Sequence, residues 1–131
     1  MAEYLVLLSN GRDSPELIGT TSLRCCWDVR TGDLGIVLDR PHWGNGYSGE
    51  RAAAMLELAF ETLGLELVTA CYNDGNTKSK RAIEKYVEQF GGQYDGLLRN
   101  WVKMDASRID DVHRYSISRE QYFNNRTLDE R

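Results

Sequence analysis

Short apolar stretches separated by turn residues fill the first third of the chain and predict strands. Asn10-Gly11 marks one turn, and Thr31-Gly32-Asp33 closes another. Strands that follow one another through short turns pair antiparallel. We therefore expect an antiparallel meander built from residues 4–9, 16–27 and 34–38.

The pattern changes to a helical period after residue 49. Apolar residues recur at spacings of three and four between Ala52 and Leu63, and Gly64 stands where a helix would end. The segment Leu65–Cys71 then predicts a strand. A strand, a loop, a helix and a strand form a crossover unit, so the two strands that flank it should be parallel.

The second half of the chain predicts one more helix and two more strands. A helix over residues 77–90 has an apolar face and ends at Gly91-Gly92, and strands are expected over residues 94–103 and 112–118. The predicted fold class is a mixed α/β sheet, antiparallel at both ends and parallel in the middle. At 131 residues the chain is long enough for one domain, which we place at residues 1–123, with a polar, frayed tail over 124–131.

Net charge, apolar runs and cysteine spacing each argue against one class of function. The net charge of −4 argues against a nucleic-acid partner, which requires a basic surface. No apolar run is long enough to span a membrane, and the N-terminus does not resemble a signal peptide, so a soluble, cytoplasmic protein is expected. Cys25, Cys26 and Cys71 form no metal-ligand pattern, and no metal site is predicted.

The most informative segment is the glycine-rich loop Gly44–Gly49, which reads G-N-G-Y-S-G. It matches the GxGxxG fingerprint of dinucleotide-binding domains, and Asp74 lies roughly where a ribose-binding acid would follow. It also suits the pyrophosphate of coenzyme A, because main-chain N–H groups at a helix N-terminus bind phosphates. The meander before the loop favours coenzyme A, since a dinucleotide domain usually opens with the strand that precedes its glycine loop.

Two longer segments resemble a known family. Residues 38–48, L-D-R-P-H-W-G-N-G-Y-S, resemble motif A of the GNAT acetyltransferases, written (R/Q)xxGx(G/A), with Trp43 and Ser48 in place of the usual residues. Residues 76–85, N-T-K-S-K-R-A-I-E-K, resemble the NxxSxRxxEK motif of its RimJ/RimL-like branch, which contains ribosomal-protein and polyamine acetyltransferases. A weaker likeness to the closing hairpin of that branch lies at residues 96–99 and 111–116. The resemblance covers about Glu16 to Gln121.

The resemblance implies an acetyl-CoA-binding GNAT fold and a division of roles. The loop would hold the pyrophosphate, the strand before it would pair with the pantetheine arm, and Ser79 would protonate the leaving thiolate. Cations in the first turn of the second helix oppose the helix dipole, which makes Arg81 a candidate phosphate ligand. The cofactor-binding residues expected are Ile36, Val37, Leu38, Trp43, Gly44, Asn45, Gly46, Tyr47, Ser48, Gly49, Asn76, Ser79 and Arg81.

The proton acceptor is less evident. In the relatives a glutamate on the penultimate strand is proposed, but residues 99–103 of this chain contain no acid. Asp111, His113 or a chain of water molecules are the candidates. Tyr86 is an alternative proton donor, although its place on the apolar helix face favours packing in the core.

The resemblance starts after the strand and two helices with which GNAT domains usually begin. The chain is therefore expected to be a short form or a fragment, and a core face left uncovered would favour a homodimer. The predicted function is transfer of an acetyl group to a primary amine, in a protein N-terminus, a polyamine or a small molecule. The alternatives are a non-catalytic acyl-CoA-binding module and a dinucleotide-binding domain.

Overall fold

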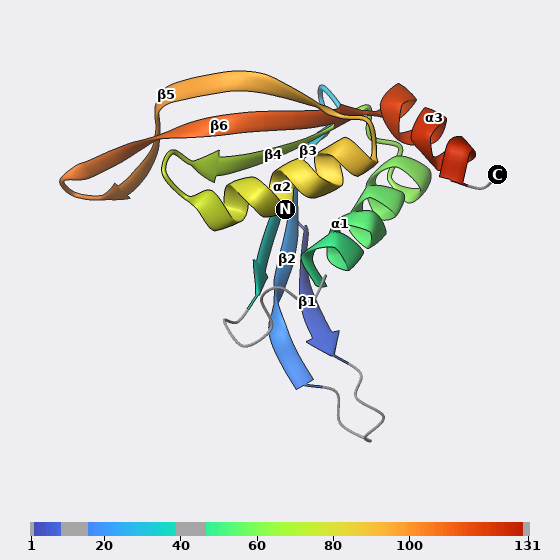
Figure 1. Cartoon of the computed structure of the whole chain (residues 1–131), viewed down its shortest axis with the longest axis horizontal. Coiled ribbons are helices and arrows are strands. Elements are labelled where there is room, and N and C mark those ends of the chain that lie inside the picture. Colours follow the sequence, from blue (N-terminus) through green and yellow to red (C-terminus); the bar gives the residue numbers. More distant parts are fainter. Residues whose placement is uncertain (1, 9–15, 39–46, 130–131) are drawn as a thin grey trace.

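A computed structural model describes residues 2–8, 16–38 and 47–129, with side chains for residues 21–35 and 49–126. This part of the chain contains six strands, three α-helices and one π-helical turn (Figure 1). The elements are β1 (Ala2–Leu8), β2 (Glu16–Cys26), β3 (Thr31–Leu38), α1 (Tyr47–Glu57), η2 (Leu58–Thr62), β4 (Leu67–Asn73), α2 (Thr77–Gln89), β5 (Gln93–Asp105), β6 (Arg108–Ser118) and α3 (Arg119–Asp129).

The described strands form a single sheet in the order β1-β2-β3-β4-β6-β5. The pair β3–β4, which flanks α1, is parallel, and each of the other neighbouring pairs is antiparallel. The predicted meander and the parallel crossover are therefore both confirmed. The dinucleotide alternative does not fit this sheet, because a doubly wound domain is built mainly from parallel strands.

The sheet divides into two wings between β3 and β4. These strands pair only from Thr31 opposite Leu67 to Asp33 opposite Thr69. Beyond Asp33, β3 continues to Leu38 in register with β2, whereas beyond Thr69, β4 continues to Asn73 in register with β6. Figure 1 shows the result, with β1–β3 running away from the direction of β4–β6. The two parallel strands therefore diverge, and Asp33 and Thr69 mark the vertex of the divergence.

The helices cover one face of the sheet. Side chains alternate between the faces of a strand, so Val68, Ala70 and Tyr72 of β4 point one way, and Thr69 and Cys71 point the other. Val68, Ala70 and Tyr72 join the hydrophobic core with α1 and α2, whereas Thr69 and Cys71 do not. The helix-free face consequently carries the polar side chains at the vertex.

The ends of the two central helices agree with the positions of the glycines in the sequence. Gly64 has φ +69° and follows the C-cap residue of the π-helical turn that extends α1, and Gly91 has φ +71° and follows the C-cap residue of α2. Glycine adopts this left-handed conformation without the steric cost that other residues carry. At the other end of α2, the Asn76 side chain accepts a hydrogen bond from the Ser79 backbone N–H at 3.2 Å and so caps the helix.

The C-terminal helix α3 was not predicted. Residues 124–129 form its second half, so the expectation of a frayed tail is wrong over these residues. Tertiary contacts explain the helix: the ring of Tyr122 stacks on Phe60 and Phe90, at centroid distances of 5.0 and 5.8 Å. The Tyr122 hydroxyl also donates a hydrogen bond to Glu61 at 2.6 Å. Packing of this kind stabilises a short polar helix that its own sequence would leave marginal.

Candidate functional site

The carboxylate of Asp33, at the vertex between β3 and β4, has a raised pKa. The Thr69 hydroxyl donates a hydrogen bond to Asp33 Oδ1 at 2.8 Å. Thr69 is buried, while Asp33 remains in contact with solvent. Loss of hydration nevertheless raises the pKa of Asp33 above its ordinary value, and this effect outweighs the hydrogen bond and the positive charges of Arg24 and Arg114, which lower it. A carboxylate whose pKa is raised binds a proton more readily than an ordinary one.

Charged groups from three further strands surround this carboxylate on the helix-free face. Arg24 lies opposite Asp33 on β2, and Arg114 of β6 forms an ion pair with Asp95 of β5, with Nε 3.1 Å from Oδ2. Between them, burial raises the pKa of the Cys71 thiol to about 11, and the negative charge of Asp33 adds to the shift. The thiol is thus protonated at neutral pH, and Cys71 has no basis as a nucleophile.

Tyr86 reaches toward the same place from α2. It is buried in the core, as the sequence indicated. Burial raises the pKa of its phenol well above the ordinary value, and the charges of Asp33 and Cys71 raise it further. The phenol is therefore neutral, and it lies within electrostatic range of the vertex even though its helix is on the other face of the sheet.

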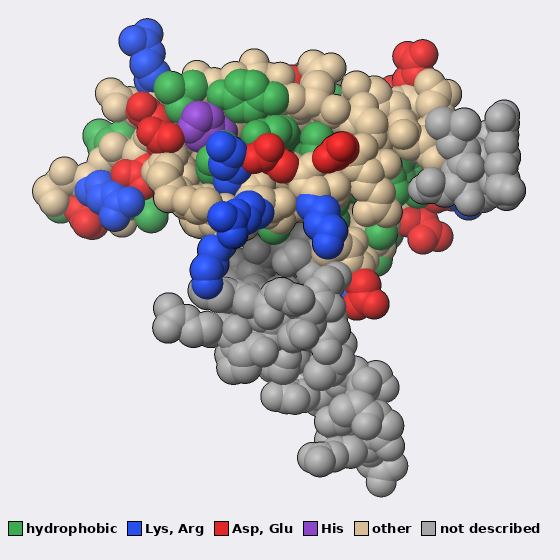
Figure 2. Space-filling model, in the orientation of Figure 1, with side chains coloured by type: hydrophobic (Ala, Val, Ile, Leu, Met, Phe, Trp, Pro, Cys, Tyr) green, Lys and Arg blue, Asp and Glu red, His purple; other side chains and the backbone are tan. Residues whose placement is uncertain are grey.

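The N-terminus of α2 is the second polar region near the opening. Its first turn contains Lys78 and Lys80 but no acid, and Arg81 follows on the exposed side. Figure 2 shows Lys and Arg side chains over the face that α2 forms. Ser79 is half-buried, between the exposed cations. Unpaired N–H groups and cations together make such a helix end suitable for an anion.

The remaining predicted residues divide into three groups. Ile36, Val37 and Leu38 form the part of β3 beyond the vertex, where β2 is paired and β4 is not. Tyr47, Ser48 and Gly49 form the first turn of α1. Trp43, Gly44, Asn45 and Gly46 lie outside the described residues.

The sequence candidates for a proton acceptor are engaged elsewhere. Asp111 accepts a hydrogen bond from the Asn100 backbone N–H at 2.8 Å, within a bulge of β5. His113 is hydrogen-bonded through both ring nitrogens. Asp33 was missed because Thr31-Gly32-Asp33 was predicted to be a turn, where aspartates are common. The structure has the turn at residues 27–30 and places Asp33 in β3, the strand that leads toward the glycine loop.

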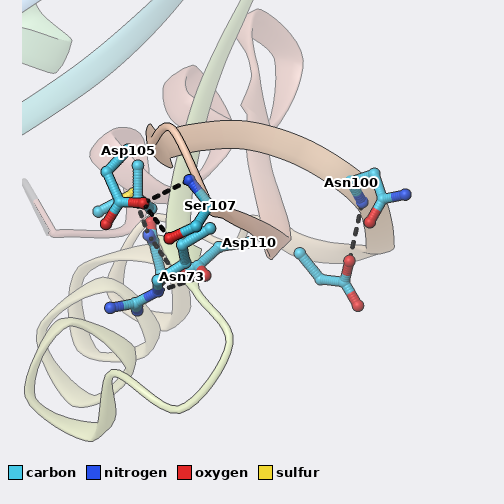
Figure 3. Close-up of polar contacts among 8 residues, drawn as sticks. Asn73, Asn100, Asp105, Ser107 and Asp110 are labelled. Atoms are coloured by element: carbon cyan, nitrogen blue, oxygen red, sulfur yellow. Dashed lines mark hydrogen bonds and ion pairs between the residues drawn. The ribbon is translucent and has the colours of Figure 1, made fainter.

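Two other acids near the end of β4 are structural. Asp110 accepts hydrogen bonds from Arg108 and from Asn73, at 2.8 and 2.9 Å, and these hold its pKa below the ordinary value. Hydrogen bonds from Ser107 lower the pKa of Asp105 in the same way. Figure 3 shows both groups where β4 meets the β5–β6 hairpin, with the Asn100 contact apart from them. Lowered pKa values make both carboxylates weak bases. Among the described residues, no group of three or more His, Cys, Asp or Glu side chains could hold a metal ion.

Comparison with known proteins decides the family. Residues 1–86 match the sequence family described as the acetyltransferase (GNAT) domain, which is about two thirds of the chain. The chain belongs to the GNAT acetyltransferase family. Within the residues described, no helix is long and apolar enough to cross a membrane.

Similar sequences carry acetyltransferase names. The chain is 29% identical over 113 residues to the uncharacterized N-acetyltransferase p20 of Bacillus licheniformis, covering 85% of this chain and 60% of that protein. It is 30% identical over 107 residues to the uncharacterized N-acetyltransferase YoaA of Bacillus subtilis strain 168, covering 81% and 58%. The chain thus spans about three fifths of the length of these relatives.

Solved GNAT structures share the fold. A GNAT-family acetyltransferase from Bacillus anthracis superposes with a TM-score of 0.76 at 24% identity, covering 90% of this chain and 66% of that one. A mutant of the spermidine N-acetyltransferase SpeG from Vibrio cholerae gives a TM-score of 0.76 at 22% identity, covering 95% and 70%. The mixed sheet with helices on one face is therefore a GNAT-like fold.

Proposed function

We propose that this chain forms the acetyl-CoA-binding and catalytic part of an N-acetyltransferase that acetylates a primary amine. The observation that carries the proposal is the opening between β3 and β4, with Asp33 at its vertex and with the N-terminus of α2 beside β4. Both the family and the motif in residues 76–85 support acetyl-CoA as the acetyl donor.

Each part of the cofactor has a matching feature in the chain. The pantetheine amides would pair with the backbone of Ile36, Val37 and Leu38, on the edge of β3 that β4 leaves unpaired. The pyrophosphate would lie against main-chain N–H groups of the segment 43–49, which ends in the first turn of α1. Asn76 would contact the pantetheine arm, and Arg81 would bind a phosphate group.

The reaction requires two proton transfers. The amine nitrogen attacks the thioester carbonyl carbon, a C–N bond forms, and the C–S bond breaks. We assign Asp33 as the group that accepts the proton from the amine, because its pKa is raised and it stands at the vertex. The leaving thiolate takes a proton from Ser79, with Tyr86 as the second candidate because its neutral phenol lies near the vertex. Asp33 then releases its proton to solvent, and solvent returns a proton to the donor.

Substitution of the two donor candidates should separate them. Ser79→Ala is expected to lower kcat by about a hundredfold, the lower range for removal of a proton donor, while Tyr86→Phe changes kcat by less than tenfold. Both substitutions remove only a hydroxyl. Steady-state kinetics with acetyl-CoA measures the difference. The reverse pattern, with the large loss in Tyr86→Phe, would transfer the assignment to Tyr86.

Acetyl transfer itself is tested with a panel of amines. The panel should contain a peptide with a free N-terminus, spermidine and a small primary amine, since SpeG, which shares the fold, is a spermidine N-acetyltransferase. Release of free coenzyme A in the presence of one amine class supports the proposal. Tight acetyl-CoA binding with no transfer to any amine would favour the alternative of an acyl-CoA-binding module.

A further inference from the structure

A chain of three side chains links β5, β6 and the connection between β4 and α2. The Tyr94 hydroxyl lies 2.9 Å from His113 Nδ1, and His113 Nε2 lies 2.8 Å from Asp74 Oδ1. The imidazole also stacks on the ring of Tyr72, with centroids 4.8 Å apart and planes inclined by 22°. The ring of His113 is consequently held on one face and at both nitrogens.

The contact with His113 fixes the first residue of the connection from β4 to α2. The backbone N–H of Asp74 donates a hydrogen bond to the carbonyl of Asp111 on β6 at 2.9 Å. Gly75 then has φ +92°, and Asn76 caps α2. Asp74 thus stands two residues before the N-cap, and both its backbone and its side chain are held by β6. Any shift of Asp74 would be passed through two residues to the first turn of α2.

Both ring nitrogens of His113 lie in hydrogen bonds, so neither is free to accept a proton from an amine. With the proton on Nε2, the ring donates to the Asp74 carboxylate, and the Nδ1 lone pair accepts from the Tyr94 hydroxyl. This arrangement gives each ring nitrogen of His113 a hydrogen-bond partner. It suits a role in positioning rather than in proton transfer.

We infer that His113 is a positioning residue which, through Asp74, holds the N-terminus of α2 in the geometry that binds the cofactor. The inference rests on the proposed function, in which Asn76, Ser79 and Arg81 contact acetyl-CoA. A residue of β6 would then affect the affinity for acetyl-CoA, although none of the proposed cofactor-binding residues lies on that strand.

Two substitutions of His113 distinguish its hydrogen bond to Asp74 from the other contacts of the imidazole ring. In His113→Gln, the amide nitrogen extends about as far as Nε2 and still donates to Asp74. In His113→Asn, the shorter side chain reaches only the position of Nδ1, so it keeps the contact with Tyr94 and loses the one with Asp74. Affinity for acetyl-CoA is measured by isothermal titration calorimetry, and KM and kcat by steady-state kinetics.

We expect His113→Asn to weaken acetyl-CoA binding about fivefold, as for the loss of one hydrogen bond, and to raise KM with little change in kcat. His113→Gln should restore most of the affinity. Asp74→Ala should match His113→Asn, and combining the two should add nothing further, as expected for residues in one contact. Affinities equal to wild type in His113→Asn, or equal losses in the Asn and Gln variants, would overturn the inference.

Hydrogen exchange keeps this test separate from the test of the proposed function. Without any ligand, the amides of residues 76–80 should exchange faster in His113→Asn than in wild type and in His113→Gln. A wild-type protein that fails to bind acetyl-CoA would refute the proposed function, and the exchange measurement would still decide the role of His113. Unchanged exchange in His113→Asn would refute that role whatever the cofactor result.

Discussion

Replacement of Asp33 by Asn should lower kcat for acetyl transfer by about a hundredfold or more, as expected when a positioned proton acceptor is removed. The amide has the same shape, and its oxygen still accepts the hydrogen bond that Thr69 donates to Asp33. It cannot accept a proton from the attacking amine at neutral pH. The affinity for acetyl-CoA should remain unchanged, because the proposed cofactor contacts lie on β3 beyond the vertex and at the helix ends. Steady-state kinetics and calorimetry together measure both quantities.

The dependence of activity on pH gives a second readout of Asp33. Its pKa is raised above the ordinary carboxyl value, so the basic form is populated only as the pH rises through that raised pKa. The kcat/KM of wild type should fall on the acidic side at a pH above that expected for a solvated carboxyl. This limb should disappear in Asp33→Asn. A variant that keeps both the rate and the acidic limb of wild type would exclude Asp33 as the base.

Asp105→Asn provides a matched control. It is the same chemical change at an exposed turn, where hydrogen bonds from Ser107 lower the pKa of the carboxylate. We expect it to leave kcat unchanged, since a carboxylate of lowered pKa is a weak base and lies at the far end of the β5–β6 hairpin. An equal loss of kcat in both variants would point to a general effect of charge rather than to proton transfer.

Asp33→Asn should also stabilise the folded protein at neutral pH. Since the folded pKa of Asp33 exceeds its unfolded value of 3.8, folding favours the protonated form. Stability from this group is present below the unfolded pKa and is lost as the pH rises through the folded pKa. Asn keeps the uncharged state at every pH, so Asp33→Asn should raise the melting temperature at pH 7 and not at low pH. A cost of this kind to stability is common at active sites and fits the role proposed for Asp33.

The backbone plan was largely predictable from the sequence, because it depends on short-range patterns. Strand alternation, the helical period after residue 49 and the glycines at 64 and 91 each act over a few residues. They sufficed for the meander, the parallel crossover and the ends of both central helices. The closing hairpin of the last two strands also followed, through the resemblance to GNAT enzymes, whereas their order in the sheet was not predicted.

The features that the sequence did not predict depend on contacts between distant residues. Asp33 and Thr69 are 36 positions apart, and the partial burial that raises the pKa of Asp33 arises only when the sheet forms. His113 and Asp74 are separated by 39 positions. Helix α3 has a polar sequence with few apolar residues, and its place is fixed by Tyr122 in an aromatic cluster. None of these relations leaves a periodic signal in the chain.

That aromatic cluster leads to the largest expected effect on stability. Phe60→Ala should reduce the free energy of unfolding by about 3–5 kcal/mol, the usual cost of deleting a buried aromatic ring. The Phe60 side chain is fully buried, and its ring stacks on Tyr122 of α3. Urea denaturation measures the change. Trp101→Ala is the control, because Trp101 is 64% exposed and its removal should change stability by less than about 0.5 kcal/mol.

Phe60→Ala should weaken two elements at once, because the Phe60 ring packs between η2 and α3. Beyond the stacking, Arg119 donates a hydrogen bond to the carbonyl of Phe60 at 2.6 Å, and Arg126 pairs with Glu61. A cavity at Phe60 therefore disturbs η2 and detaches α3, and the amides of α3 should lose protection from hydrogen exchange in the variant. If Phe60→Ala does not fold, Phe60→Leu, which leaves a smaller cavity, should show the same loss of protection in α3. Full protection of α3 in either variant would mean that the helix is held by its polar contacts and not by the aromatic cluster.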